Sequence, residues 1–293
     1  MSEVSVSPPE PAAVAVITIV SGRHLHLRRQ LEALAHSTVT PRVHVIVAMD
    51  DPDIDRVVDE VAPRGHRTRV IHLDHPGDTL PLAAARNSGA AEAISFAPGL
   101  LVFLDVDCVP APDMIERYAR SAAGAGDTKL LHCGPVTYLP ADQPTFDARD
   151  LHRSTSPHPA RPAPEDGSIE VSEAMTLFWS LSFAVTPAAW LEIGGFHTGY
   201  TGYGGEDTDF AMCARDKGFR IAWIGGAHAY HQHHPVSDPP VEHLADILRN
   251  ARVFHERWGS WPMEGWLHGF AERGLVEHDA DADDWLMTEV AEP

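Results

Sequence analysis

The first hundred residues show two patterns of apolar positions, continuous runs and helical spacing. Four short and nearly continuous apolar runs lie at 14–20, 43–48, 69–73 and 100–104. Between them, apolar residues recur at helical spacing, most clearly at 24–36 and 80–96. Continuous apolar runs are typical of strands buried on both faces, and their alternation with helices is typical of parallel sheets. The pattern predicts an α/β fold, with a Rossmann-like, mostly parallel central sheet and helices on both faces.

The second half of the chain is less regular. Residues 140–172 begin with a polar, proline-rich stretch that has no strong period, and we predict a mobile loop there. Apolar residues return at 175–185, residues 219–224 form another predicted strand, and residues 240–258 have helical spacing. We expect a C-terminal helical extension over 239–275.

The two ends of the chain are predicted to lack regular structure. Residues 1–13 are rich in proline, which favours a disordered N-terminus. The last eighteen residues, 276–293, hold seven acids and no Lys or Arg, which is typical of a solvated acidic tail.

The charge balance excludes several classes of partner. The chain has 22 Lys and Arg against 42 Asp and Glu, a formal net charge of −20, so phosphate backbones and anionic membrane surfaces should repel it. The N-terminal apolar run, Ala12–Val20, is nine residues long, far below the ~20 of a transmembrane helix. Three cysteines without a CxxC pair fit a reducing cytoplasm. We therefore expect a cytoplasmic protein without a nucleic-acid partner or transmembrane segment.

The sharpest chemical signal is the sequence LVFLDVDCVP at 101–110. Asp105 and Asp107 follow a predicted buried strand and, as residues i and i+2, point the same way. Two close carboxylates repel each other unless a cation lies between them, and hard oxygen ligands favour Mg²⁺ or Mn²⁺. The alternative is a pair of solvated turn aspartates.

A second acidic group follows glycines in the sequence YGGEDTDF at 203–210. If a helix begins near Glu206, then Glu206 and Asp207 lie in its first turn, where the helix dipole favours ionised carboxylates. An ionised carboxylate in a cleft can serve as a general base, whereas the alternative role is helix capping.

Histidines and isolated arginines supply the remaining candidates. Four histidines lie within 228–234, and His231 and His233 share a face if the preceding strand extends that far. These histidines suit either a metal site or a polar loop. Arg23 and Arg86 are among the few cations and suit phosphate or carboxylate groups, unless they are ordinary surface residues.

Taken together, four motifs in order resemble the GT-A nucleotide-sugar glycosyltransferases, of the β-1,4-galactosyltransferase type and its bacterial family 2 relatives. The motifs are GRHLHL at 22–27, ARNSGAAEA at 85–93, FLDVDCVP at 103–110 and IGGFHTGYTGYGGEDTDF at 193–210. The resemblance implies a GT-A domain over 14–238. Its nucleotide-binding half would be 14–110 and its acceptor half 130–238.

The resemblance also implies roles at the donor site. Asp50, with Asp51 as the fallback, would meet the nucleotide base. Arg23, Arg86 and Asn87 would line the nucleotide and diphosphate pocket. Asp105 would contact the ribose or the metal, and Val106 is also implied to bind the donor. Asp107 would bind a divalent metal, Mn²⁺ or Mg²⁺, and His231 would be the distal ligand, with His233 as the competing choice.

At the acceptor side, the resemblance implies that Asp207 is the catalytic base and that Glu206 binds the acceptor hydroxyl. The implied reaction moves a sugar from a nucleotide diphosphate donor, a UDP-sugar, to a hydroxyl acceptor with inversion. The galactosyltransferase type has glycines in its donor-sugar strand where this chain reads FWSLSF at 178–183, so the donor sugar stays open.

Two other functions fit parts of the pattern. A haloacid-dehalogenase-like phosphohydrolase would use Asp105 as a nucleophile, because its motif is also a hydrophobic strand followed by Asp-x-Asp. A non-catalytic sugar- or metal-binding module could share the fold. A homodimer through the C-terminal helix or the acidic tail is also left open.

Overall fold

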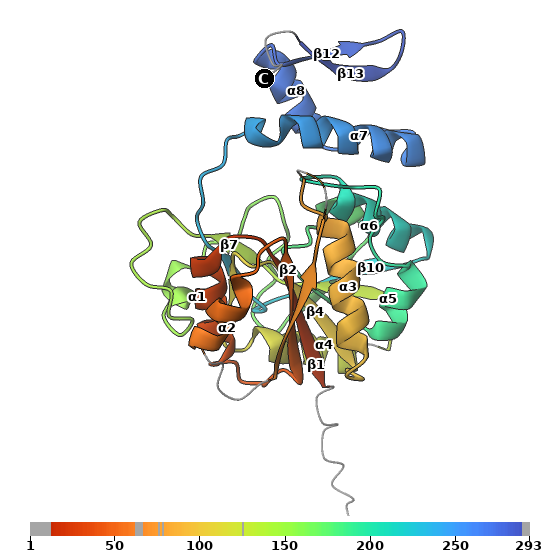
Figure 1. Ribbon diagram of the computed structural model, residues 1–293. Helices are drawn as coiled ribbons and strands as arrows, with labels where there is room; N and C mark the ends of the chain where they lie inside the picture. Colours follow the sequence, from red (N-terminus) through yellow and green to blue (C-terminus); the bar gives the residue numbers. More distant parts are fainter. Residues whose placement is uncertain (1–12, 62–66, 76, 78, 125, 289–293) are drawn as a thin grey trace, which may run out of the picture.

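Eight strands form the central sheet of this computed structural model, which describes residues 13–61, 67–75, 77, 79–124 and 126–288 (Figure 1). The strand order is β3-β2-β1-β4-β9-β6-β10-β8. The bounds of these strands are β1 Val14–Val20, β2 Val43–Met49, β3 Thr68–Leu73, β4 Leu100–Leu104, β6 Leu130–Cys133, β8 Ile169–Ser172, β9 Ser182–Val185 and β10 Arg220–Ile224. The predicted strands in the first hundred residues, and the one near residue 220, are confirmed.

The sheet is mostly parallel, as the apolar runs predict. β3, β2, β1 and β4 are mutually parallel, and so are β6 and β10. β9 runs antiparallel between β4 and β6, and β8 runs antiparallel at the edge beside β10. Strands β1, β2 and β4 are buried along their whole length, which explains why they carry no polar alternation.

Helices cover both faces of the sheet, which confirms the predicted architecture (Figure 1). The bounds of the helices in this part of the chain are α1 His24–Leu34, α2 Ile54–Val61, α3 Leu82–Ile94, α4 Met114–Gly124, α5 Pro187–Ile193 and α6 Glu206–Asp216. Alternate residues of β1 point to opposite faces: Ala15 and Ile17 pack with α3, α5 and α6, whereas Val14 and Val16 pack with α4. The repeated leucines from which helix α1 was predicted pack it into the core, and Leu27 and Leu31 are fully buried.

A small second sheet lies beyond the end of β4. Its strands are β5 Cys108–Pro110, β11 Ala229–His231 and β7 Val136–Tyr138, in that order. β11 pairs antiparallel with β5, so that His231 lies opposite Cys108. This pairing brings the histidine tract, more than a hundred residues away in the chain, beside the Asp105–Asp107 motif.

The C-terminal part forms helices and a hairpin. Helices α7 Leu244–Trp258 and α8 Glu264–Glu272 occupy the stretch expected to be a helical extension, and strands β12 Val276–Asp279 and β13 Asp284–Met287 follow. The expectation of a solvated tail from residue 276 is therefore wrong for residues 276–287. Val276 and Trp285 are buried against α7 and α8, because Val276, Trp285 and Met287 lie on one face of the hairpin.

Two further segments, 1–13 and 140–172, were expected to lack regular structure. Of the N-terminal segment 1–13, all but the last residue lies outside the described residues. Within 140–172 the structure has a short 3-10 helix, Leu151–Ser154, and strand β8, and Leu151 is fully buried. The mobility of this segment stays a prediction. Within the described ranges, no helix has the length and hydropathy required to cross a membrane.

Candidate active site

The turn after β4 holds the Asp105–Asp107 motif in a fixed conformation. The buried side chain of Gln30, on α1, donates to the carbonyl oxygens of Asp105 (2.7 Å) and Cys108 (3.0 Å). Its own carbonyl accepts from the Thr18 hydroxyl on β1 at 2.9 Å. Sequence reasoning missed Gln30, although a polar residue on the leucine face of α1 was a usable signal. The turn is therefore anchored to the strand and the helix beside it.

Asp107, His231 and His234 form a group that could hold a metal ion. Their ligand atoms all lie within 4.8 Å of one another. Asp107 Oδ2 is 3.5 Å from Nε2 of His231 and 3.5 Å from Nε2 of His234, and its buried Oδ1 has no hydrogen-bond partner in the described chain. A cation about 2.1 Å from two ligand atoms, at an angle near 110°, would hold them about 3.4 Å apart. The residues therefore fit a divalent cation in both distance and chemistry.

The group that the structure brings together contains His231 and His234 but not His233. His231 is 8% exposed at the end of β11, as expected of a ligand, but the His233 side chain is exposed and lies outside the group. The chain leaves the strand after His231, so the strand rule that pairs residues i and i+2 fails there. Instead, the backbone N–H of the buried Gln232 donates to the Asp107 carbonyl at 2.7 Å, and His234 turns back toward Asp107.

The two imidazoles are held in the neutral form that binds metals. Burial lowers the pKa of His231 and of His234, and the positive charge of Arg23 lowers both further, against the opposing effect of Asp107. The ring of Tyr138 stacks on His231 with centroids 4.5 Å apart, which fixes the imidazole plane. A neutral, oriented imidazole is available as a ligand near neutral pH.

Arg86 joins the two acidic motifs. It lies on α3 with its side chain 5% exposed, and it donates to Asp105 Oδ1 at 3.1 Å and to Glu206 Oε1 at 3.0 Å. Burial alone would lower the pKa of Arg86, but the charges of Asp105 and Glu206 outweigh it and raise the pKa. The sequence predicted an anion-binding residue here. In this structure the anions are the two carboxylates, so Arg86 sets the position of α6 relative to β4.

Asp207 is poised to exchange a proton near neutral pH. It lies beside Glu206 in the first turn of α6, and its Oδ1 accepts hydrogen bonds from the backbone N–H (2.7 Å) and hydroxyl (3.3 Å) of Thr208. Burial and the negative charge of Glu206 raise the pKa of Asp207 to about 7, although these hydrogen bonds and Arg86 oppose the shift. A carboxylate with this pKa suits general-base chemistry.

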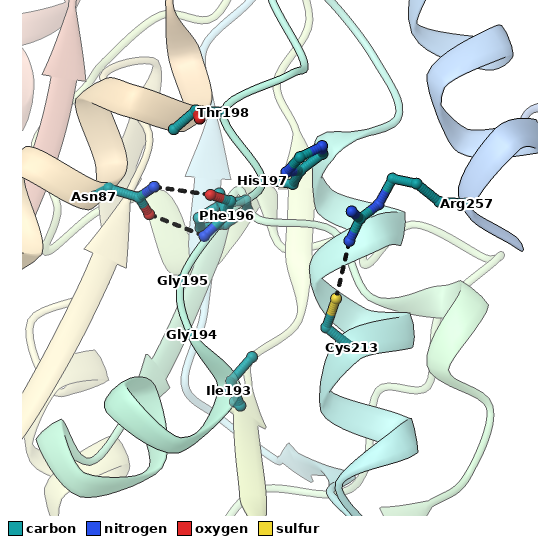
Figure 2. A pocket seen from close by; sticks show the side chains of 9 residues that line it. All are labelled: Asn87, Ile193, Gly194, Gly195, Phe196, His197, Thr198, Cys213 and Arg257. Atoms are coloured by element: carbon teal, nitrogen blue, oxygen red, sulfur yellow. Dashed lines mark hydrogen bonds between the residues drawn. The ribbon is translucent and has the colours of Figure 1, made fainter.

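Asn87, which the resemblance placed in the nucleotide pocket, holds the backbone of a neighbouring loop in this structure. Its Nδ2 donates to the Phe196 carbonyl at 2.8 Å and its Oδ1 accepts from the Phe196 N–H at 2.9 Å, so both ends of the amide hold backbone (Figure 2). At Gly195 a Cβ would lie 2.7 Å from Asn87 Oδ1, so only glycine permits this approach. The adjoining cavity, of about 380 Å³, is lined by neither Asp107 nor Asp207, so we place the candidate site elsewhere.

The remaining predicted nucleotide contacts lie in the loops after β1, β2 and β4. Arg23 is exposed at the start of α1, close enough to His26 and to the metal-site histidines to lower their pKa. Asp50 is exposed and accepts from the His75 N–H at 2.9 Å. Asp51 accepts instead from the Gly22 N–H and from His24, so it braces the loop that carries Arg23. The Val106 side chain packs into the core between α1 and α2, which leaves its backbone for contacts.

Comparisons with known proteins identify two family segments. Residues 15–131 match the model of glycosyl transferase family 2, and residues 170–235 match the model described as the N-terminal domain of galactosyltransferase. The first segment contains Asp105 and Asp107, and the second contains Asp207 and both candidate histidine ligands.

Two curated relatives are validoxylamine A glucosyltransferases from Streptomyces hygroscopicus. The protein of subspecies limoneus is 26% identical over 224 residues, which cover 69% of this chain and 49% of that protein. The protein of subspecies jinggangensis is 26% identical over 213 residues, which cover 67% of this chain and 50% of that protein. The chain spans about half the length of these relatives.

Solved structures share the fold at low sequence identity. GalNAc-T7 with UDP, GalNAc and Mn²⁺ matches with a TM-score of 0.56 at 11% identity, covering 90% of this chain and 57% of that chain. Residues 1–349 of S. aureus TarS, in complex with UDP-GlcNAc, match with a TM-score of 0.57 at 12% identity, covering 87% and 75%. The mannosyltransferase PcManGT of Pyrobaculum calidifontis, with GDP-Man and Mn²⁺, matches with a TM-score of 0.53 at 15% identity, covering 92% and 68%.

These matches favour the glycosyltransferase interpretation over the phosphohydrolase alternative. The sheet topology, the motif at the end of β4 and the two family segments agree with one another. The chain therefore carries a segment that matches glycosyl transferase family 2, followed by a segment that matches the galactosyltransferase model, on a fold that it shares with solved glycosyltransferases of the GT-A fold.

Proposed function

We propose that this chain transfers a sugar from a UDP-sugar to a hydroxyl of an acceptor, with Mn²⁺ or Mg²⁺ held by Asp107, His231 and His234. The observation that carries the proposal is the geometry of the Asp107 carboxylate: its Oδ2 lies 3.5 Å from Nε2 of both His231 and His234, and its buried Oδ1 has no hydrogen-bond partner among the described residues. When bound, the cation would act as a Lewis acid and stabilise the charge on the departing diphosphate.

Binding of the donor requires positive charge in a strongly acidic protein. With a formal net charge of −20, the chain repels a nucleotide diphosphate at long range. Arg23 is exposed next to the proposed metal ligands, and we infer that its guanidinium contacts the diphosphate. Asp50, exposed at the end of β2, is proposed to accept a hydrogen bond from the nucleotide base.

Asp207 is the proposed base. It would take the proton from the acceptor hydroxyl while that oxygen attacks the anomeric carbon from the face opposite the diphosphate. This single displacement inverts the configuration of the sugar. Glu206 shares the Arg86 guanidinium with Asp105 and would bind the acceptor through its other carboxylate oxygen.

The comparisons supply the first substrates to test. Two of the similar solved structures contain UDP or UDP-GlcNAc and one contains GDP-Man, which makes UDP the first nucleotide and GDP the second. The names of the curated relatives make glucose the first sugar and validoxylamine A the first acceptor. A cytoplasmic location stays a prediction.

The test is turnover of UDP-glucose with Mn²⁺, with and without the acceptor, in the wild type and in Asp207→Asn. We expect Asp207→Asn to lose turnover by about 10²–10⁴-fold, because the base is removed, while UDP binding with Mn²⁺ survives. Turnover that survives in Asp207→Asn would contradict the assignment of the base. UDP binding without turnover by the wild type, for any donor and acceptor tried, would favour the non-catalytic module.

A further inference from the structure

The turn at 201–205 sets the direction of both proposed acceptor-side carboxylates. It leads directly into α6, whose first two residues are Glu206 and Asp207. Three of its residues, Gly202, Gly204 and Gly205, have positive φ angles of 68°, 94° and 89°. Glycine makes this path accessible but adds no rigidity of its own. Contacts from elsewhere must therefore hold the turn.

Asn250, on α7, supplies most of these contacts. Its side chain is fully buried, and its Nδ2 donates to the carbonyl oxygens of Thr201 (3.0 Å), Tyr203 (3.2 Å) and Gly204 (2.8 Å). Its Oδ1 accepts from the Thr201 N–H at 3.4 Å. One amide group therefore bonds three of the four residues from 201 to 204 through their backbone.

Asp246, one helical turn earlier on α7, completes the clamp. Its Oδ2 accepts from the Tyr203 N–H at 3.2 Å, and its Oδ1 accepts from Arg249, which also donates to the Thr201 carbonyl. A Cβ added at Gly202 would lie 2.1 Å from Asp246 Oδ2. The Asp246 side chain thus lies directly against the turn, and it would have to move to admit a Cβ at position 202.

The other end of α7 holds α6 beyond the proposed base. The buried Asp209 accepts hydrogen bonds on Oδ1 from Arg257 Nε (2.7 Å) and from Trp258 Nε1 (2.7 Å). Asp207 therefore lies between two attachments to α7, one at the turn and one at Asp209. In Figure 1, α7 lies across the end of the α/β body at which α6 begins.

We propose that Asn250 is a positioning residue for the transfer reaction, and that it acts through the 201–204 backbone to hold Asp207 in place. This inference rests on the proposed function, in which Asp207 is the base. Helix α7 lies outside both matched segments, 15–131 and 170–235, so neither family model assigns it a role. The C-terminal extension thereby becomes part of the catalytic unit.

The test compares Asn250→Ala with Arg252→Ala. Arg252 lies on the same helix, but it donates to Asp284 (2.8 Å) and to the Trp285 carbonyl, and so holds the hairpin rather than the turn. Both variants lose hydrogen bonds that fasten the C-terminal extension. Only Asn250→Ala frees the turn before Asp207.

We expect Asn250→Ala to lower kcat about 10- to 100-fold, because small displacements of a reacting group carry penalties of this size. UDP affinity and the donor KM should stay unchanged, because the donor contacts lie on other elements. Hydrogen exchange of the amides at 201–208 should become at least tenfold faster in Asn250→Ala and stay at the wild-type rate in Arg252→Ala.

Two outcomes would overturn the inference. One is exchange at 201–208 that stays slow in Asn250→Ala. The other is a fall in kcat that Arg252→Ala reproduces at a matched loss of thermal stability. If the wild type shows no transfer, the proposed function fails, and the exchange comparison still reports whether Asn250 holds the turn.

Discussion

Asp107 and Asp207 reach the same candidate site by two different structural routes. Asp107 follows β4, a strand buried between β1 and β9, and the turn that carries it is bonded to Gln30 of the neighbouring α1. Asp207 follows a glycine turn whose backbone is held by side chains of α7, some forty residues later in the chain. The metal side of the site is therefore fixed by the sheet itself, whereas the base side depends on a separate C-terminal segment.

This difference predicts where substitutions act. Changes near β4 should alter metal and donor binding, and changes at the turn or on α7 should alter the chemical step. Arg86 is the exception, because it bonds one carboxylate from each side.

The largest expected effect is a loss of unfolding free energy when Arg86, which bonds both sides of the site, is replaced. Replacing Arg86 by Met leaves the Asp105 and Glu206 carboxylates together without their cation, and breaking a buried pair typically costs about 3–5 kcal/mol. We expect a loss near the lower end of that range, because the Asp105 side chain is 22% exposed. Urea unfolding in EDTA measures it.

The control for Arg86→Met is Arg69→Met. Arg69 pairs with Glu92 at 2.8 Å, but its side chain is 53% exposed. Removing an exposed pair typically changes the free energy of unfolding by less than about 1 kcal/mol. Equal losses in the two variants would mean that Arg86 does not join the two halves of the site.

The next effect separates the two candidate histidines of the metal side. His234→Ala should weaken Mn²⁺ binding at least about tenfold, since it removes a proposed ligand, whereas His233→Ala should leave the affinity unchanged. Titration of Mn²⁺ by calorimetry gives both affinities. A larger loss in His233→Ala would restore the ligand choice made from strand periodicity.

The last effect is the pH dependence of the base side. Burial and Glu206 raise the pKa of Asp207 to about 7, above the ~3.9 of an unfolded aspartate. Between these values the folded chain binds more protons than the unfolded one, so stability should decrease as pH rises from about 4 to 7. This slope should be reduced in Asp207→Asn when both proteins unfold in EDTA.

Activity should have the opposite dependence on pH. A base must be ionised, so turnover should fall as pH falls below the pKa of Asp207. A bound cation favours the ionised carboxylate, so it should move the acid side of the pH–rate profile to lower pH. A pH–rate profile that shows no fall on the acid side, down to the ~3.9 of an unperturbed aspartate, would contradict the assignment of Asp207.

The same contrast explains what the sequence predicted. Strands β1 to β4 and the Asp105–Asp107 motif were predictable, because a continuous apolar run that ends in acids is a local signal. The start of α6 at Glu206, with acids in its first turn, was predictable from the glycines before it. In both cases the residues that make the element and the residues that carry the chemistry are adjacent in the chain.

Other features depended on contacts between distant segments. His234 was missed because the chain leaves β11 after His231, and that turn follows from the backbone bond of Gln232 to Asp107. The antiparallel β9 and the β12–β13 hairpin likewise depend on partners that a local pattern does not name. Asn250 gives no signal at all in a helix predicted only from its apolar spacing.

The central claim is that Asp107 and its two histidines hold a divalent cation that binds a nucleotide diphosphate. Thermal unfolding with UDP, in Mn²⁺ or in EDTA, for the wild type and Asp107→Ala, tests it most directly. At a hundredfold excess over Kd, a ligand that binds only the native state adds about 2.7 kcal/mol of stability. We predict stabilisation of the wild type by UDP with Mn²⁺, and none in EDTA or in Asp107→Ala. Equal stabilisation by UDP in EDTA, or none by UDP or GDP under any condition, would contradict the claim.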